Sequence, residues 1–146
     1  MIMKQITKNQ QQTIELGKKI ASKLKSGDIV LLHGNLGAGK TTLVKGIAQE
    51  LNIEEEITSP TFTLMNVYKI LPVGRQVKNL IHIDTYRLEN EEDLIEIGVE
   101  DYLGEPDTIC IIEWPEKIKG LLKNKKTIDI TIEHLSEKER VVVCNT

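Results

Sequence analysis

The stretch Gly34-Asn-Leu-Gly-Ala-Gly39-Lys40-Thr41 fits the pattern G-x-x-x-x-G-K-[ST] at every fixed position. It follows a continuous apolar run, Ile29–Leu32, which is typical of a strand buried on both faces, and it precedes a segment to about Leu51 that we expect to be helical. Glycine backbones can turn successive N–H groups inward around phosphate oxygens, and the positive end of the helix faces the same point. The sequence therefore predicts a P-loop in an α/β fold.

The loop positions predict how a nucleotide would be held. We expect Lys40 to reach the β- and γ-phosphates of ATP as a mobile positive charge, and the Thr41 hydroxyl to be a ligand of Mg²⁺. A glycine-rich turn with a surface lysine is the alternative, but the strand before the loop and the helix after it favour phosphate binding. The predicted nucleotide contacts in this stretch are Asn35, Leu36, Gly37, Ala38, Gly39, Lys40, Thr41 and Thr42.

Acidic residues follow two further strand candidates. Ile109–Glu113 is an apolar run that ends in an acid, which is typical of a Walker B strand, so we expect Glu113 to hold the magnesium with Thr41. The alternative is an ordinary strand with a charged end, and the P-loop favours the metal site. Asp84 follows the strand candidate Leu80–Ile83 and could orient the attacking water or hold a metal-bound water. The predicted catalytic residues are thus Asp84, Lys40 and Glu113.

Four other features near these strands leave alternatives open. Arg87 could stabilise phosphoryl charge, or form a salt bridge with Asp84 or a neighbouring acid. For His82 we favour a hydrogen-bonded strand histidine. Ser59-Pro60-Thr61 lies where a switch loop would lie, although an ordinary turn explains it as well. Trp114 could stack on a base or on a partner, or cover the edge of the sheet.

The remaining pattern predicts the layers of the fold. Apolar residues at helical spacing predict a helix over Gln10–Lys25 with Asn9 as its N-cap. We further expect strands over Phe62–Ile70, Leu80–Ile83 and Thr108–Ile112, a short helix over Glu91–Ile97, and a hairpin of Thr127–Glu133 and Arg140–Cys144. The prediction is a single three-layer, P-loop NTPase-like domain over residues 1–146. Its central sheet is mainly parallel, with an antiparallel edge or C-terminal hairpin.

Composition narrows the class of protein. The 146 residues suit one domain, and a net charge of −3 with 3% aromatic residues disfavours tight, direct binding of RNA or DNA. No apolar run is long enough to span a bilayer, and the polar stretch Met1–Gln12 lacks the apolar core of a signal peptide. Cys110 and Cys144 form no disulfide framework. We therefore expect a cytoplasmic protein that does not contact membranes.

Other P-loop classes fit the sequence less well. GTPases carry N-K-x-D and D-x-x-G, whereas Asn124-Lys-Lys-Thr127 lacks the aspartate and Asp84-Thr-Tyr-Arg87 lacks the glycine. Small-molecule kinases usually carry several arginines in a lid, and this chain has only Arg75, Arg87 and Arg140. A stand-alone small-molecule kinase stays an alternative. A third interpretation is a nucleotide-dependent binding module without consequential hydrolysis.

Four motifs occur in order along the chain. They are Gly34-Asn-Leu-Gly-Ala-Gly-Lys-Thr-Thr42, Ser59-Pro-Thr-Phe-Thr63, His82-Ile-Asp-Thr-Tyr-Arg-Leu88 and Ile112-Glu-Trp-Pro-Glu116. Together they resemble the TsaE (YjeE-type) family, the ATPase subunits of the bacterial machinery that makes threonylcarbamoyladenosine in tRNA. The resemblance runs from Thr13 to Glu116. The segment Leu71–Lys78 departs from the usual connection of the family, and the residues from Lys117 onward carry no motif that matches.

The resemblance implies a function. The family serves transfer of a threonylcarbamoyl group to the adenosine beside the anticodon of tRNAs that read codons starting with A. The transferase is a partner protein, TsaD, which acts with TsaB. The TsaE-like subunit binds this pair and hydrolyses ATP to reset it. The resemblance therefore implies that the subunit reaches tRNA only through the complex. Hydrolysis without partners is expected to be weak. Carried over to this sequence, the resemblance implies phosphate binding by Gly37–Thr42, magnesium binding by Thr41 and Glu113, hydrolysis through Asp84, and contacts of Thr13 with adenine and of Trp114 with nucleotide or partner.

Overall fold

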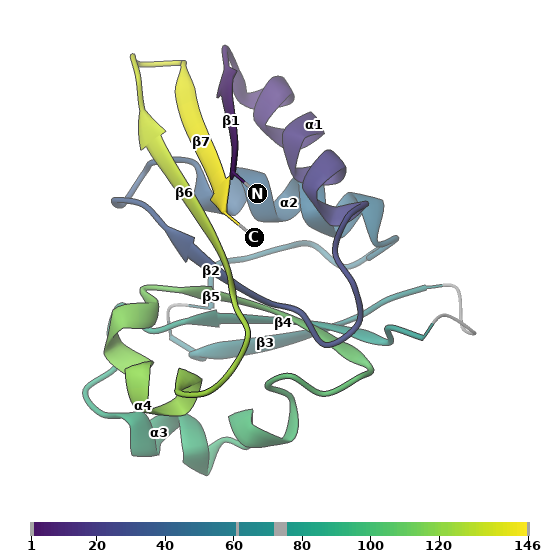
Figure 1. The fold of residues 1–146 in the computed structure, drawn as a ribbon, viewed down its shortest axis with the longest axis vertical. Helices are drawn as coiled ribbons and strands as arrows, with labels where there is room; N and C mark the ends of the chain where they lie inside the picture. The colour runs from purple at the N-terminus through teal and green to yellow at the C-terminus, as the bar shows by residue number, and fades with distance from the viewer. Residues whose placement is uncertain (1, 61, 72–75, 146) are drawn as a thin grey trace.

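The computed structural model describes residues 2–60, 62–71 and 76–145. Seven strands form one sheet in the order β1-β7-β6-β2-β5-β4-β3 (Figure 1). The four neighbouring strands β6, β2, β5 and β4 run parallel, and antiparallel strands complete both edges. The bounds are β1 (Ile2–Thr7), β2 (Ile29–His33), β3 (Met65–Lys69), β4 (Asn79–Asp84), β5 (Thr108–Glu113), β6 (Ile128–His134) and β7 (Arg140–Asn145).

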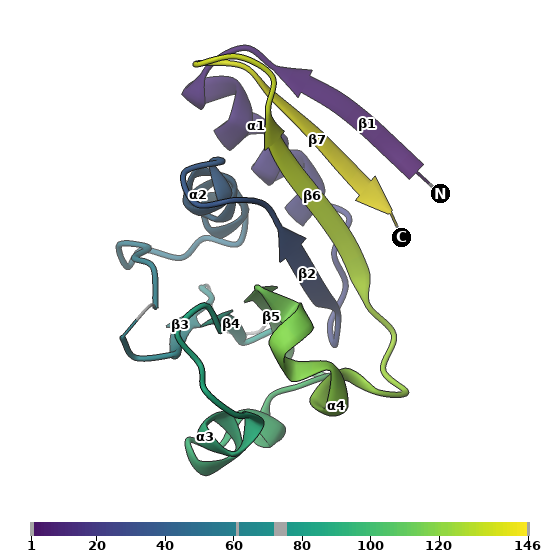
Figure 2. The same ribbon diagram turned by 90° about the vertical axis from the view of Figure 1, so that its left-hand side faces the viewer.

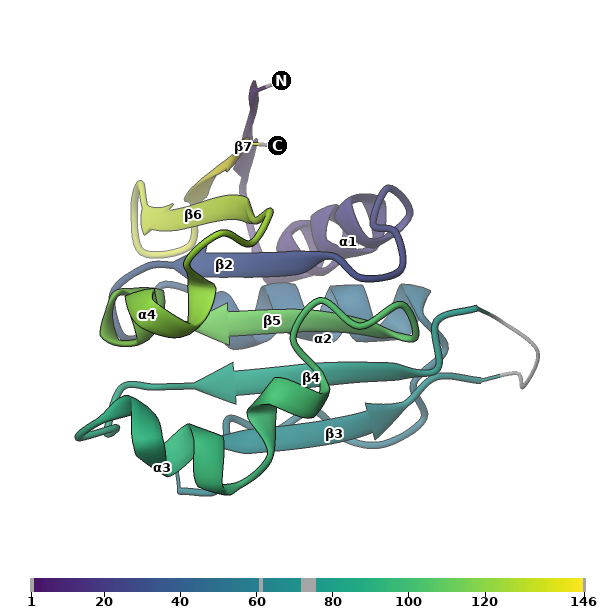
Figure 3. The ribbon, with the colours of Figure 1, turned by 60° about the horizontal axis from the view of Figure 1, so that its bottom comes forward.

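Helices cover both faces of this sheet. The helices α1 (Gln10–Ala21) and α2 (Lys40–Glu50) lie on one face, and α3 (Glu91–Glu96) and α4 (Lys119–Leu122) lie on the other (Figures 2 and 3). Two 3-10 turns, η1 (Val99–Asp101) and η2 (Pro115–Ile118), flank α3 and α4. The predicted three-layer α/β architecture with a mainly parallel centre is confirmed. Within the described ranges, none of the helices has the length and apolar character needed to cross a bilayer.

Alternate side chains of the buried strands pack into two separate cores, one on each face of the sheet. In β2, Val30 and Leu32 pack in the core under α1 and α2, while Ile29 packs in the core on the other face. In β5, Ile111 faces α1 and α2, and Ile112 faces the opposite side. Successive strand residues point to opposite faces, so a strand covered on both faces reads as an unbroken apolar run.

Two glycines bring α1 and α2 into backbone contact. A Cβ atom on Gly46 would lie 2.1 Å from the carbonyl oxygen of Ile14, and one on Gly17 would lie 2.4 Å from the carbonyl oxygen of Leu43. A side chain at either position would therefore push the helices apart. This contact fixes the position of α2, whose first residue, Lys40, follows directly from the P-loop.

One strand is absent from the sequence predictions. β1 pairs with β7 along its whole length, from Ile2 opposite Asn145 to Thr7 opposite Arg140. Of its six residues only Thr7 is buried, so the strand lacks the apolar alternation that reveals most strands. Backbone pairing at the edge of the sheet, rather than side-chain burial, defines it.

Two predicted elements are shorter in the structure. α1 ends at Ala21 instead of Lys25, because the chain continues in tighter turns in which Lys23 N–H donates to the carbonyl oxygen of Ile20. β3 begins at Met65 instead of Phe62, because Leu64 has a φ of +67° that a strand does not allow. The predicted C-terminal hairpin is confirmed, since β6 and β7 pair antiparallel.

Candidate nucleotide-binding site

The register of β4 and β5 brings two acids together. Asp84 and Glu113 are direct partners at the carboxyl ends of these parallel strands. His82 lies two residues before Asp84 and therefore on the same face of the sheet. Their exposed fractions are only 6% for Asp84, 4% for Glu113 and 0% for His82. These side chains lie on the face covered by α2, next to the P-loop, at the edge where open α/β sheets bind ligands.

Glycines shape the P-loop at three positions. Gly37 and Gly39 have φ values of +77° and +105°, which side chains rarely adopt, and Gly39 is the N-cap of α2. Gly34 approaches the neighbouring strand so closely that a Cβ atom would lie 2.6 Å from the carbonyl oxygen of Ile132. The loop thus has the turned backbone that a phosphate-binding nest requires, and it leads directly into the amino end of α2.

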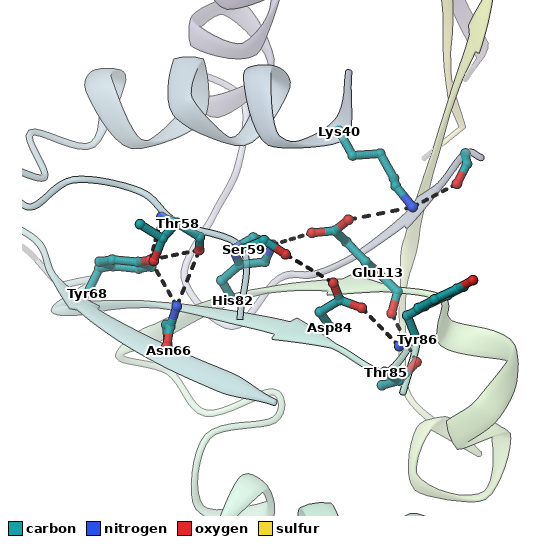
Figure 4. Close-up of polar contacts among 11 residues, drawn as sticks. Lys40, Thr58, Ser59, Asn66, Tyr68, His82, Asp84, Thr85, Tyr86 and Glu113 are labelled. Atoms are coloured by element: carbon teal, nitrogen blue, oxygen red, sulfur yellow. Dashed lines mark hydrogen bonds and ion pairs between the residues drawn. The ribbon is translucent and has the colours of Figure 1, made fainter. Parts of the chain in front are cut away.

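Lys40 is held among groups of the site itself. Its Nζ donates to the carbonyl oxygen of Gly34 at 2.7 Å and lies 3.6 Å from Glu113 Oε1 (Figure 4). Nζ also lies 4.2 Å from the centroid of the Trp114 ring. The side chain is 6% exposed. Trp114 therefore covers the lysine. The ring of Tyr86 lies beside that of Trp114, with 5.1 Å between the two ring centroids. The positive charge of Lys40 is thus positioned to bind an anion beside the P-loop.

Glu113 divides its two oxygens between different partners. Oε1 faces Lys40, and Oε2 lies 2.6 Å from His82 Nε2. Burial raises the pKa of the Glu113 carboxyl, but the contact with His82 and the charge of Lys40 outweigh it, so the pKa lies below its usual value. His82 is a strand histidine that is hydrogen-bonded through Nε2, as expected, but its Nδ1 is buried without a partner among the described residues, so the ring is satisfied on one side only.

Asp84 is fixed on both of its oxygens. The Ser59 hydroxyl donates to Oδ2 at 3.2 Å, and the Tyr86 N–H donates to Oδ1 at 2.9 Å (Figure 4). Its predicted neighbour Arg87 does not pair with it, since the guanidinium carbon of Arg87 lies 4.7 Å from the centroid of the Phe62 ring and no ion pair joins Arg87 to Asp84 in the described part of the chain. Asp84 thus keeps a set orientation at the end of β4.

The loop that carries Ser59 is tied down next to it. The N–H of Thr58 donates to the Tyr68 hydroxyl of β3 at 3.2 Å, and the amide of Asn66 donates to the Thr58 carbonyl oxygen at 3.3 Å (Figure 4). Thr61, the third residue of the predicted switch segment, lies outside the described residues, as do residues 72–75 of the segment Leu71–Lys78. The predicted switch loop therefore reaches the site through Ser59.

Two hollows meet at the P-loop. Gly37, Gly39 and Thr42 line both of them. Asn35 instead lines a third hollow with Trp114. The first hollow is also lined by Leu36, Lys40, Thr41, Ser59, Asp84, Tyr86, Arg87, Glu113 and Trp114, which include all three predicted catalytic residues. The second is also lined by Asn9, Gln10, Thr13, Glu137, Lys138 and Arg140.

Sequence reasoning missed Arg140 and Thr85. Arg140 Nε donates to the carbonyl oxygen of Ala38 at 2.8 Å, which joins the P-loop to a strand 102 residues later. The Thr85 hydroxyl donates to the carbonyl oxygen of Glu113 at 3.1 Å and also contacts that of Trp114, whose φ is +58°. Neither residue belongs to a local motif that reveals these contacts, because both depend on the packing of distant segments.

The residues around the first hollow fit a magnesium–nucleotide pair. Thr41 and Glu113 offer hydroxyl and carboxylate oxygens, which are hard ligands of the kind that Mg²⁺ takes beside phosphate oxygens. The P-loop backbone and Lys40 offer the hydrogen-bond donors and the positive charge that phosphates require. Thr13 lines the second hollow, and its hydroxyl lies 2.7 Å from that of Thr7.

Comparison with known proteins assigns the family. The model of the family "Threonylcarbamoyl adenosine biosynthesis protein TsaE" matches residues 7–142. The chain is 39% identical to the tRNA threonylcarbamoyladenosine biosynthesis protein TsaE of Treponema pallidum, covering 96% of this chain and 98% of that one. It is 35% identical to TsaE of Bacillus subtilis, covering 96% and 85%. The crystal structure of Bacillus subtilis YdiB superposes with a TM-score of 0.77 at 29% identity, covering 99% of this chain and 84% of that one. The chain therefore belongs to the TsaE family of tRNA threonylcarbamoyladenosine biosynthesis proteins.

Proposed function

We propose that this chain is a magnesium-dependent ATPase that acts on a TsaD–TsaB-like partner pair in the cytoplasm. As a TsaE family member it is a component of threonylcarbamoyladenosine synthesis in tRNA, and the proposal adds its activity and partners. The observation that supports hydrolysis best is the convergence of Lys40, Asp84 and Glu113. They come from α2, β4 and β5 and line one hollow beside the P-loop.

The two adjoining hollows support an extended nucleotide across the P-loop. We infer that the phosphates lie over Gly37–Thr42, because the hollows share three residues of this loop. The γ-phosphate would face the first hollow, where Lys40 would exchange its contact with the Gly34 carbonyl for phosphate oxygens. The base and ribose would extend into the second hollow, toward Thr13 and the β6–β7 hairpin.

Glu113 and Asp84 would then have different roles. Thr41 and Glu113 would hold Mg²⁺, which when bound neutralises phosphate charge. Asp84 has both oxygens engaged by donors, so its carboxylate is oriented in advance to accept a hydrogen bond from the attacking water. Because the Ser59 hydroxyl contacts Asp84, a movement of this loop would alter the water-binding group directly.

The placement of the arginine side chains leads us to expect slow ATP hydrolysis in the absence of partners. Phosphoryl transfer gains much of its rate from an arginine that stabilises the charge of the transition state. Of the two arginines in the described residues, Arg87 has its guanidinium over the Phe62 ring and Arg140 donates to backbone carbonyl oxygens. A partner that displaces Arg87 from Phe62, or supplies its own cation, would therefore raise the rate.

The test is phosphate release from magnesium-ATP with and without a purified TsaD–TsaB pair. We expect the pair to raise the rate at least tenfold, since one transition-state cation contributes about 10³–10⁵ to the rate of phosphoryl transfer. Glu113→Gln and Asp84→Asn should each remove this gain. Asp129→Asn is the matched control, because Asp129 is also a strand carboxylate but pairs with His33 away from the two hollows.

The same assay separates the alternatives. Transfer of the labelled γ-phosphate to an acceptor in a metabolite extract, with little release as inorganic phosphate, would identify a stand-alone kinase and contradict the proposal. An unchanged rate with the pair, together with nucleotide-dependent binding to it that survives Asp84→Asn, would identify a binding module instead.

A further inference from the structure

His82 is a buried polar residue whose only side-chain hydrogen bond, within the described part of the chain, goes to the proposed metal ligand. Its Nε2 lies 2.6 Å from Glu113 Oε2, and its ring is fully buried in β4 between two neighbouring strands. Since a carboxylate oxygen accepts, this contact is a hydrogen bond in which His82 Nε2 is the ring nitrogen that carries the hydrogen. Nδ1, on the other side of the ring, has no hydrogen-bond partner in the described residues.

A histidine that only filled space would be unfavourable here. Leaving a buried polar atom without a partner is destabilising, and an apolar side chain of similar size would avoid this cost. Leu80, two residues before His82 and on the same face of β4, shows that an apolar residue packs well on this side of the strand. The imidazole is therefore explained by its single contact with Glu113 rather than by packing.

We propose that His82 is a positioning residue for magnesium, an inference that rests on the proposed function of Glu113. By donating to Oε2, His82 stops rotation of the carboxylate and keeps Oε1 on the side of Lys40 and the P-loop. Outer contacts of this kind orient metal-binding carboxylates, and their loss typically lowers metal affinity or activity 10- to 100-fold. His82 itself would touch neither metal nor nucleotide, since it lines neither hollow.

The experiment measures how strongly Mg²⁺ tightens ADP binding. ADP dissociation constants are determined for the full chain in EDTA and in excess Mg²⁺, and their ratio gives the magnesium enhancement. The fluorescence of Trp114 reports binding, because it is the only tryptophan and its ring lies 4.2 Å from Lys40 Nζ. The variants are His82→Met, which lacks a donor, and His82→Gln, whose longer amide can donate at the place of Nε2.

We expect His82→Met to lower the magnesium enhancement about tenfold, while affinity in EDTA stays within about twofold. His82→Gln should restore the enhancement to within about threefold of the wild type. His33→Met is the matched control, because His33 is also a strand histidine but ends β2, which β5 separates from β4, and it contacts a different carboxylate, Asp129, at 2.9 Å. It should leave the magnesium enhancement unchanged.

Two results would overturn the inference. One is an equal loss of ADP affinity with and without Mg²⁺ in His82→Met, and the other is a His82→Gln variant that binds like His82→Met. If His82→Met does not fold, His82→Gln is compared with His82→Asn, whose shorter amide cannot reach Glu113. A wild-type chain in which Mg²⁺ does not tighten ADP binding would instead refute the metal role of Glu113, so the two failures are distinguishable.

Discussion

The contact between α1 and α2 predicts that Gly46→Ala destabilises the fold. In an exposed helix interior the same change is stabilising by about 1 kcal/mol, because alanine is the better helix former. Here the new Cβ atom would lie 2.1 Å from the carbonyl oxygen of Ile14, whereas ordinary contacts begin near 3.4 Å. The obstacle is backbone, which no rotamer change can move, so the helices must separate by roughly 1 Å.

The expected magnitude follows from these opposing terms. Overpacking of this kind costs about 1–3 kcal/mol, and a backbone obstacle belongs at the upper end of that range. Subtracting the gain in helix propensity leaves a net loss of about 2 kcal/mol. For a chain of this size such a loss lowers the melting temperature by about 4–8 °C.

Thermal and urea unfolding, followed by circular dichroism, test this prediction. Gly120→Ala is the control, since Gly120 is also helical but its new Cβ atom would meet Glu91 Oε2, the movable end of a side chain, at 2.7 Å. We expect Gly120→Ala to stay within about 1 kcal/mol of the wild type. A Gly46→Ala chain that melts at or above the wild-type temperature would refute the close packing of the two helices.

Three further predictions follow from single contacts. The pKa of Glu113 lies below its usual value, so its ionised form stabilises the fold above about pH 4.5, and this contribution is lost as the pH falls further. We therefore expect the loss of stability caused by Glu113→Gln, measured by urea unfolding, to become smaller below that pH. Arg140→Met removes the donor to the Ala38 carbonyl and should weaken ADP binding about tenfold in calorimetry, whereas an unchanged dissociation constant would contradict a role in holding the P-loop. Burial raises the pKa of Cys110 to about 11, so iodoacetamide at neutral pH should modify this thiol only after unfolding, as intact mass would show.

Local signals explain why much of the fold and the P-loop could be predicted. The run Ile29–Leu32 is unbroken because β2 is covered on both faces, and glycines follow it where the backbone must take positive φ values. Glu113 and Asp84 could be proposed for the site because each directly follows an apolar strand, and such ends gather at one edge of a parallel sheet.

Contacts between distant segments explain what could not be predicted. β1 is held by backbone pairing with β7 and has almost no buried side chains, so its sequence carries no strand period. Arg140 contacts Ala38 across 102 residues, and no local pattern around either residue signals that meeting. That His82 Nδ1 has no partner among the residues that the structure describes likewise depends on what surrounds β4 in three dimensions, whereas the sequence shows only a histidine in an apolar strand.

The geometry of the site is set by residues on the opposite face of the sheet. In β4 and β5, Ile81, Ile83 and Ile112 pack into the core beneath α3, and the alternation then requires His82, Asp84 and Glu113 to face α2. Because β4 and β5 are covered on both faces, a slip of one residue would exchange apolar side chains between the two cores, but it would bury the acid of the slipped strand in the core beneath α3 without a partner. That cost opposes the slip, so the pairing of Asp84 with Glu113 is favoured by an apolar core that takes no part in the chemistry. The acids can therefore be held close together at the P-loop although their own charges repel.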